Sequence, residues 1–276
     1  SGDHLDLHSF PPRRSSDLLI IEDPGKINLR QMARRMCDRG NGVGADGLLV
    51  LGKSAKADFR MRVINADGSE AEMCGNGARC MAGHIVRRHK TRKRQFTLET
   101  LAGQILAEAE GDTALVRLSD PRDYRPEISL DVRDRQIHVH SINTGVPHVI
   151  VFVDQLAEVD VNGIGPEIRY HPAFAPRGTN VNFVEQTGTN RITARTYERG
   201  VEAETRACGT GSVAAAIVTW LAAHPDTRDE AQARMRVKTA SGEVLAISFA
   251  VRDRVVQDVW LKGSARLIAD GRYFWK

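Results

Sequence analysis

The pattern Cys-Gly-x-Gly occurs twice in the chain, and each copy opens a segment of small and apolar residues. Cys74-Gly75-Asn76-Gly77 precedes residues 78–86, and Cys208-Gly209-Thr210-Gly211 precedes residues 212–223. The spacing predicts a helix after each turn, and the second is apolar almost all round, which is typical of a buried helix. First-turn amides have no intrahelical partner and carry partial positive charge. We therefore expect each thiol to lie at a helix N-terminus, which lowers the pKa of the thiol and can bind an anion beside it.

The likeness between the two regions extends beyond the turns. Residues 100–106 (Thr-Leu-Ala-Gly-Gln-Ile-Leu) follow the first predicted helix, as residues 239–245 (Thr-Ala-Ser-Gly-Glu-Val-Leu) follow the second. Two similar units, each with one thiol at a helix start, indicate a duplication with a pseudo-twofold site between the halves. The sequence thus predicts a pair of thiols facing one substrate.

Composition limits the class of protein. The 276 residues suffice for one large domain or two ordinary ones, and a net charge of +4 with 27% charged residues singles out neither nucleic acid nor membrane as partner. The four cysteines form no Cys-x-x-Cys pair and no disulfide-like framework, which fits a reducing compartment. No apolar run is long enough to cross a bilayer and no leader opens the chain, so a cytoplasmic protein is expected.

Two stretches have alternative interpretations. The glycine-rich residues 39–47 could be a phosphate loop, but no Gly-Lys-Ser/Thr follows and no helix begins there. The basic residues 87–94 could contact nucleic acid, but without interleaved aromatics they fit a solvated helix end better. The spacing of Cys74, Cys80, His84 and His89 matches no usual zinc pattern, so no metal is expected.

The coarse pattern predicts an α/β (α+β) protein. Many strand-like segments surround one apolar helix per half, which favours two pseudo-symmetric halves, each a barrel-like, mostly antiparallel sheet around a central helix. Residues 1–17 show no periodicity and resemble a translated sequencing-adapter read-through, so they are expected to be foreign or disordered. Residues 18–119 form the first half and residues 120–262 the second, with the crossing between them at residues 121–126.

Seven blocks of the sequence, in order, resemble those of diaminopimelate epimerases: residues 42–47, 65–70, 74–80, 145–148, 178–183, 197–200 and 207–211. The resemblance covers roughly residues 17 to 276 and implies a cofactor-independent isomerase. Such an enzyme interconverts LL- and meso-diaminopimelate on the route to lysine and peptidoglycan, usually as a homodimer. The family fold also implies that residues 263–276 return to the first half.

The chemistry explains why two thiols are needed. Inverting an α-carbon requires removal of a proton from one face and delivery to the other, so one thiolate acts as base and the opposing thiol as acid. By resemblance, Cys74 and Cys208 are this pair. The amides of Gly75, Asn76, Gly209 and Thr210 are suited to hold the substrate α-carboxylate as charge spreads onto it. Since that stabilisation requires a dry site, closure of the halves is expected.

The resemblance also implies roles for polar side chains. The distal amino-acid end of the substrate would be bound by Asn65, Asn180, Glu198 and Arg199. The Glu198 carboxylate would pair with the substrate ammonium, and the Arg199 guanidinium with the substrate carboxylate. His148 and Glu198 would tune a thiol pKa. Cys37 and Cys80 are interpreted as packing residues. The alternative interpretations are that Glu198 and Arg199 form a surface ion pair and that the two asparagines are turn residues.

The sequence departs from the family at its start, where members carry Asn-Asp-Phe after a glycine-rich segment. Ser16 replaces the asparagine that contacts substrate, so a deficit in substrate binding is expected and loss of the native first strand with it. Three rival hypotheses remain: a proline, hydroxyproline or phenazine-type isomerase of the same fold; a damaged relative that only binds ligand; and a dithiol redox protein.

Overall fold

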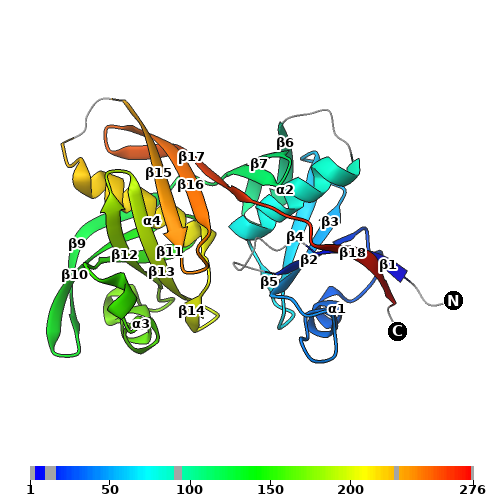
Figure 1. Cartoon of the computed structure of the whole chain (residues 1–276), viewed down its shortest axis with the longest axis horizontal. Coiled ribbons are helices and arrows are strands. Elements are labelled where there is room, and N and C mark those ends of the chain that lie inside the picture. Colours follow the sequence, from blue (N-terminus) through cyan, green and yellow to red (C-terminus); the bar gives the residue numbers. More distant parts are fainter. Residues whose placement is uncertain (1–3, 10–16, 90–94, 227–229, 275–276) are drawn as a thin grey trace. The chain divides into compact units, whose positions relative to one another are not determined.

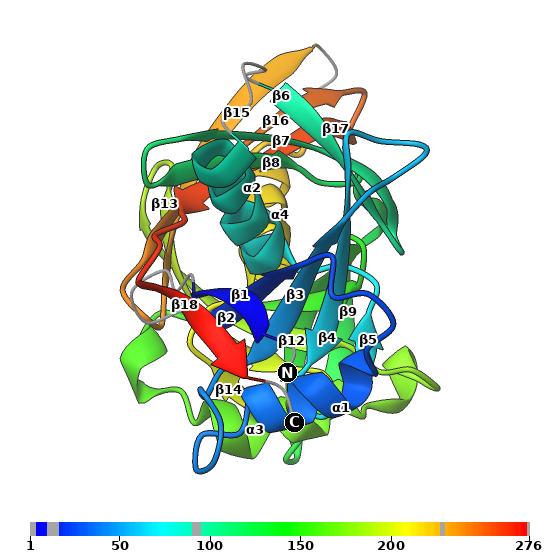
Figure 2. The ribbon, with the colours of Figure 1, turned by 90° about the vertical axis from the view of Figure 1, so that its right-hand side faces the viewer.

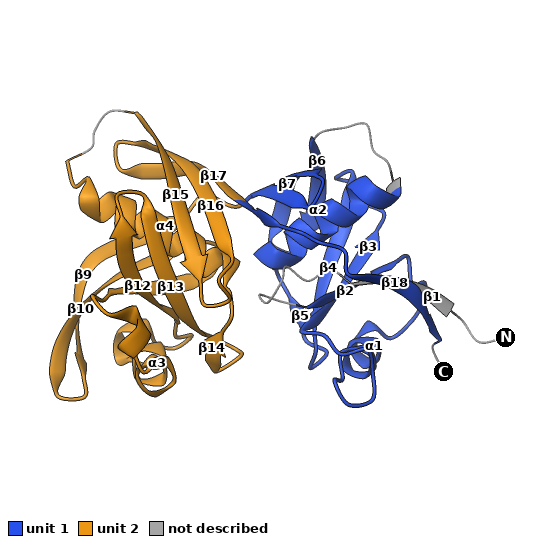
Figure 3. Cartoon of the chain, in the orientation of Figure 1, with its two compact units in different colours: residues 1–117, 262–276 blue, residues 118–261 orange. Residues whose placement is uncertain are grey.

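The computed structural model describes residues 4–9, 17–89, 95–226 and 230–274. The chain forms two compact units, coloured separately in Figure 3. Unit 1 comprises residues 1–117 and 262–276, and unit 2 comprises residues 118–261. Within the described part of the chain, no helix is long and apolar enough to cross a membrane.

Unit 1 is a mixed sheet with one long helix and one short one (Figure 1). Its elements are β1 (His4–Ser9), β2 (Leu18–Glu22), α1 (Leu29–Met36), β3 (Gly47–Gly52), β4 (Phe59–Asn65), β5 (Glu70–Ala71), α2 (Gly75–His89), β6 (Gln95–Thr100), β7 (Gly103–Glu110), β8 (Thr113–Arg117) and β18 (Ala269–Phe274). The helix α2 packs against β2, β3, β4, β7 and β8, and Figure 2 shows it among these strands.

Unit 2 follows the same plan. Its elements are β9 (Arg122–Val132), β10 (Arg135–Asn143), β11 (Pro147–Phe152), η1 (Leu156–Glu158), α3 (Val161–Arg169), η2 (Pro172–Phe174), β12 (Asn180–Gly188), β13 (Arg191–Glu198), β14 (Ala203–Thr205), α4 (Gly209–Ala223), β15 (Ala231–Thr239), β16 (Val244–Arg252) and β17 (Val255–Ser264), whose last residues belong to unit 1. The helix α4 contacts β10, β11, β12, β13, β15 and β16.

Strand pairing repeats between the units. β2 pairs parallel with β3, β3 antiparallel with β4, and β4 with both β5 and β6. In unit 2, β11 pairs parallel with β12, β12 antiparallel with β13, and β13 with both β14 and β15. The hairpins β6–β7 and β15–β16 follow α2 and α4. The predicted fold class, two pseudo-symmetric halves with a helix central to each sheet, is confirmed.

Local sequence explains the elements that place the helices. Alternate residues of β15 are buried, beginning at Ala233 and ending at Thr239, which is the period of a strand with one face on the core. In α4 every residue from Gly211 to Leu221 is buried, as its largely apolar composition predicts. Asn28 caps α1, since its side-chain oxygen accepts from the Gln31 amide at 3.2 Å.

Two segments differ from expectation. His4–Ser9, within the stretch expected to be foreign or disordered, forms β1, whose backbone pairs antiparallel with β2 and β18. These residues therefore form a first strand. Their side chains differ from those expected at this position, but strand pairing uses backbone groups and needs no particular side chains. Residues 121–126, expected as the crossing, lie mostly in β9. Pro126 obscured that strand in the sequence; it sits at an irregularity in the β9–β10 register, where proline is tolerated.

Candidate active site

Cys208 stands at the start of the buried helix of unit 2. It is the N-cap of α4, in extended backbone conformation, and only 8% of it is exposed. Its Sγ accepts from the Gly211 amide at 3.4 Å and lies 3.5 Å from the Thr210 hydroxyl. An N-cap side chain that accepts first-turn amides sits at the positive end of the helix dipole. This geometry favours a negative charge on the sulfur.

Cys74 occupies the same position in unit 1. It directly precedes α2 and is partly buried, and its Sγ accepts from the Gly77 amide at 3.2 Å. Its carbonyl accepts from the Ala78 amide at 2.8 Å, which begins the helix. The two Cys-Gly-x-Gly turns are therefore equivalent in backbone hydrogen bonding as well as in sequence.

A hairpin turn supports the segment before each cysteine. The Ala102 amide, in the turn of β6–β7, donates to the Glu72 carbonyl at 3.1 Å, two residues before the first cysteine. The Ser241 amide, in the turn of β15–β16, donates to the Arg206 carbonyl at 2.8 Å, two residues before the second. The sequence likeness of residues 100–106 and 239–245 thus has a structural function, since each turn holds the chain that presents a thiol.

An arginine–glutamate pair lies before each cysteine and was missed by the sequence interpretation. Arg62 donates from Nε and Nη2 to the two carboxylate oxygens of Glu70, both at 2.8 Å. Arg195 binds Glu204 in the same way, at 2.8 and 2.7 Å. These hydrogen bonds lower the pKa of the Glu70 carboxyl below its ordinary value. The signal was present, because a glutamate stands four residues before each cysteine.

His148 lies fully buried beside the Cys208 turn. Its Nε2 is 3.1 Å from the Thr210 hydroxyl and its Nδ1 is 3.2 Å from Nδ2 of Asn182. Burial, followed by the positive charge of Arg199, lowers the pKa of His148 to about 3. The imidazole is therefore neutral at physiological pH and acts as a hydrogen-bonding group.

Of the residues expected to bind the distal end of the substrate, all except Asn65 lie in unit 2. Asn180 accepts from the Arg199 amide at 2.9 Å and donates to the Pro147 carbonyl at 2.9 Å. Its side chain thus holds the backbone next to Arg199 and retains one N–H for another partner. Burial raises the pKa of the adjacent Glu198 carboxyl above its ordinary value.

Unit 1 contributes the other predicted residues. Asn65, at the exposed end of β4, donates to the Ser69 hydroxyl at 2.9 Å across a turn. Asn76, in the first turn of α2, is buried and accepts from Arg79 at 2.7 Å. Asp17 exchanges hydrogen bonds with Asp46, while Ser16 lies outside the described residues.

The remaining cysteines fit packing roles. Cys80 is buried inside α2, and Cys37 is the buried C-cap of α1. Burial, with the charge of Asp46 as a smaller contribution, raises the pKa of the Cys37 thiol to about 11. A thiol with that pKa is neither a base nor a nucleophile at neutral pH.

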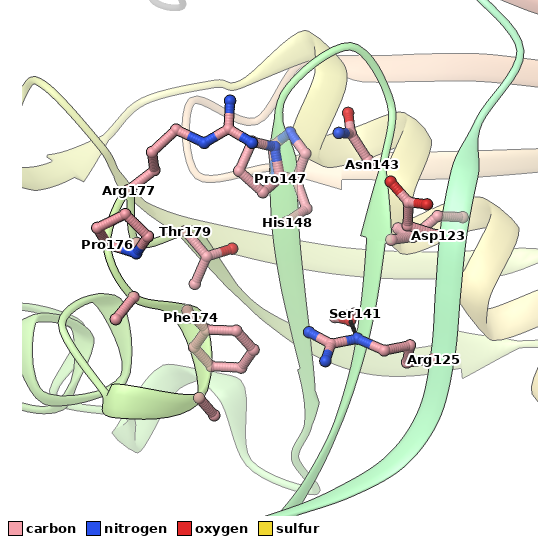
Figure 4. Close-up of a pocket in the computed structure, with 14 residues that line it drawn as sticks. Asp123, Arg125, Ser141, Asn143, Pro147, His148, Phe174, Pro176, Arg177 and Thr179 are labelled. Atoms are coloured by element: carbon pink, nitrogen blue, oxygen red, sulfur yellow. Dashed lines mark hydrogen bonds between the residues drawn. The ribbon is translucent and has the colours of Figure 1, made fainter.

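Unit 2 also holds a pocket of about 380 Å³ between β9, β10 and the segment that leads into β12 (Figure 4). Arg125, which donates to the Ser141 hydroxyl at 3.2 Å, and Arg177 lie on opposite sides of it, and His148 forms part of its wall. Its described lining residues do not include Cys208 or Arg199. The pocket is therefore a neighbour of the cysteine turn and is distinct from it.

Solved structures of related fold support the architecture. The chain aligns with a phenazine biosynthesis protein of the PhzF family from Bacillus anthracis over 99% of its length and 100% of that chain, with a TM-score of 0.75 and 16% identity. It aligns with a hydroxyproline epimerase from Agrobacterium vitis over 98% of its length and 92% of that chain, with a TM-score of 0.70 and 15% identity. These likenesses establish the fold alone.

Sequence comparison is more specific. A diaminopimelate epimerase from Aquifex aeolicus is 40% identical over 272 residues, covering 93% of this chain and 94% of the relative. One from Methanocella arvoryzae is 41% identical over 251 residues, covering 87% and 85%. The family profile for diaminopimelate epimerase matches residues 15–122 and 140–267. With two equivalent cysteine turns and these matches across both units, the chain belongs to the diaminopimelate epimerase family.

Proposed function

We propose that this chain is a diaminopimelate epimerase that interconverts LL- and meso-diaminopimelate without a cofactor. The observation that carries the proposal is the repeated presentation of a thiol, Cys74 in one unit and Cys208 in the other, at the N-terminus of a buried central helix. Both sulfurs accept a first-turn amide. The segment before each cysteine is held by the amide of a hairpin turn and carries an arginine–glutamate pair.

The reaction follows from two such groups on opposite faces of a carbon. One thiolate takes the α-proton, and the electron pair left on the carbon spreads into the α-carboxylate. The opposing thiol then donates its proton to the other face, so the two sulfurs exchange protonation states and no other atom is consumed. First-turn amides of Gly75, Asn76, Gly209 and Thr210 would stabilise the developing charge at the carboxylate.

The distal end of the substrate carries a second ammonium and carboxylate. Arg199 would bind the carboxylate, and Asn180 would orient Arg199 through its backbone amide. Glu198 would accept the ammonium, and Asn65 would add a hydrogen bond from unit 1. Burial raises the pKa of Glu198 because it destabilises the ionised carboxylate, and a substrate ammonium beside it would stabilise that ionised form.

The test follows α-proton exchange of LL-diaminopimelate by NMR in deuterated water under reducing conditions. Wild type is expected to give meso product carrying deuterium, whereas Cys208→Ala and Cys74→Ala are expected to give none. Cys37→Ala is the matched control, because it removes a buried thiol of raised pKa and should leave the rate unchanged. Formation of meso product at the wild-type rate by either active-site variant would refute the proposal.

Two further arms separate the rival hypotheses. Hydroxyproline and proline should exchange no α-proton if the substrate is diaminopimelate. If folded wild type is inactive, Ser16→Asn tests the departure at the start of the chain; recovery of kcat/KM would assign the defect to substrate binding. No gain from Ser16→Asn would contradict that assignment and favour another substrate.

Assembly and location are also part of the proposal. We infer a homodimer in the cytoplasm from the family to which the chain belongs. Sedimentation velocity in reducing buffer tests the first inference, with a single species at the monomer mass as the contrary result, and cell fractionation tests the second.

A further inference from the structure

We propose that Asn182 is a positioning residue that fixes the tautomer of His148 and thereby directs the Thr210 hydroxyl proton to the Cys208 sulfur. The proposal deepens the proposed function, because it concerns the thiol that would exchange the substrate proton. It depends on four side chains of unit 2 and on their order of donation.

The first step is the orientation of the Asn182 amide. Its Nδ2 lies 3.0 Å from the Val149 carbonyl, which can only accept, so this atom is the nitrogen. Its Oδ1 accepts from the Thr196 hydroxyl at 2.9 Å. Asn182 is fully buried, so the amide has no solvent partner to compete with these bonds.

The second step is the tautomer of His148. The other Nδ2 hydrogen of Asn182 points to Nδ1 of His148 at 3.2 Å, so Nδ1 must accept. A neutral imidazole that accepts at Nδ1 carries its proton on Nε2. Nε2 therefore donates to the Thr210 hydroxyl oxygen at 3.1 Å.

The third step reaches the sulfur. Because the Thr210 oxygen accepts from His148, its own proton is available for another acceptor, and Cys208 Sγ lies 3.5 Å away. The Thr144 hydroxyl donates to the Thr210 carbonyl at 3.1 Å and holds this residue in place. The thiolate of Cys208 thus receives a hydroxyl donor in addition to the Gly211 amide. Hydrogen bonds to the charged form of a group lower its pKa.

The glycine at position 211 has a role in the same arrangement. A Cβ there would lie 2.3 Å from Oδ1 of Asn182, so only glycine lets the amide approach the cysteine turn. The charged group that acts on His148 is Arg199, whose positive charge opposes imidazolium and thus favours the neutral ring. Fixed donation and a glycine-dependent approach both point to Asn182 as the residue that sets the hydrogen-bond direction.

The first experiment reads the tautomer directly. Ring ¹⁵N–¹H correlation spectra of the full-length protein are recorded between pH 5 and 9, and His148 is assigned by comparison with His148→Gln. The proposal expects a single neutral tautomer protonated at Nε2 throughout. Protonation at Nδ1, or an imidazolium signal in this range, would overturn it.

The second experiment measures the alkylation rate of Cys208 by iodoacetamide at pH 7. Trypsin places each of the four cysteines in a separate peptide, so mass spectrometry follows Cys208 alone in the intact chain. Thr210→Val keeps the side-chain shape and removes the donor. Alkylation is expected to slow about tenfold, because a thiol pKa higher by one unit lowers the thiolate fraction about tenfold. Thr210→Ser retains the hydroxyl and should react at the wild-type rate.

A matched pair of variants isolates Asn182. Asn182→Leu removes the donor to His148 and is expected to produce a second ring tautomer and to slow Cys208 alkylation about threefold. Thr196→Val removes a different hydrogen bond of the same buried amide and should leave both readouts unchanged. A purely structural role for Asn182 predicts that the two variants behave alike, which would refute the proposal.

These readouts require no substrate. A protein that is inactive towards diaminopimelate, and stays inactive as Ser16→Asn, but shows the expected tautomer and alkylation pattern would disprove the proposed function and leave this inference standing. An active epimerase in which Cys208 of Thr210→Val is alkylated as fast as in wild type would support the proposed function and refute this inference.

Discussion

The two equivalent glycines at positions 77 and 211 allow one substitution to be compared in two surroundings. Each donates its amide to the cysteine sulfur three residues earlier. A Cβ at Gly211 would lie 2.3 Å from Asn182 Oδ1, whereas a Cβ at Gly77 would lie 2.9 Å from the terminal methyl Cδ2 of Leu49. Alanine should therefore be tolerated at one position and not at the other.

The magnitudes follow from what must move. Asn182 cannot yield without weakening its bonds to Val149, Thr196 and His148, each worth about 1 kcal/mol. Replacing glycine by alanine in a helix gains about 1 kcal/mol, so Gly211→Ala should destabilise unit 2 by about 2 kcal/mol. For Gly77→Ala, an off-rotamer leucine costs about 1 kcal/mol, so the net change in unit 1 should be close to zero.

The assay must resolve the two units, because a two-unit chain does not guarantee two-state unfolding. Amide hydrogen exchange with mass spectrometry reports local opening free energies for α2 and α4 separately. Gly211→Ala should accelerate exchange in α4 about thirtyfold, the factor for 2 kcal/mol, whereas Gly77→Ala should leave α2 within about fivefold of wild type. Equal acceleration in the two helices would refute the reasoning from Asn182.

Three further predictions concern other contacts. Glu204→Gln removes the charge that binds Arg195 and should lower the stability of β14 by about 1–2 kcal/mol, seen as faster exchange there but not at β5. Because the folded pKa of His148, about 3, lies below its ordinary 6.5, the unfolded chain binds the proton more tightly. The stability contributed by neutral His148 is expected to be complete above pH 6.5 and to fall by about 1.4 kcal/mol per pH unit down to about pH 3, and urea titrations of His148→Gln should lack this part of the slope. Removal of residues 1–9 leaves β2 and β18 without their shared partner, so exchange there should rise; unchanged protection would contradict the pairing.

The parts of the site that follow a local pattern could be predicted from the sequence. The cysteine turns, the buried helices and the repeated hairpins depend on residues close in the chain, and their spacing is visible without a structure. Asn182 and Thr196 could not be identified in this way, because their importance comes from a register between β12 and β13 that brings their side chains together. β1 and β9 were missed for a different reason, since pairing with neighbouring strands decides a weak or proline-containing strand.

Duplication has a consequence for how the two thiols can be adjusted. Each unit carries its own hairpin support and its own arginine–glutamate pair, so a change in one leaves the other intact. The position after the first glycine residue differs, however: Thr210 offers a hydroxyl to its sulfur, whereas Asn76 is bound by Arg79. A symmetric scaffold can therefore hold two sulfurs of unequal acidity. Selection could then adjust the acidity of one sulfur by altering a single residue in one half.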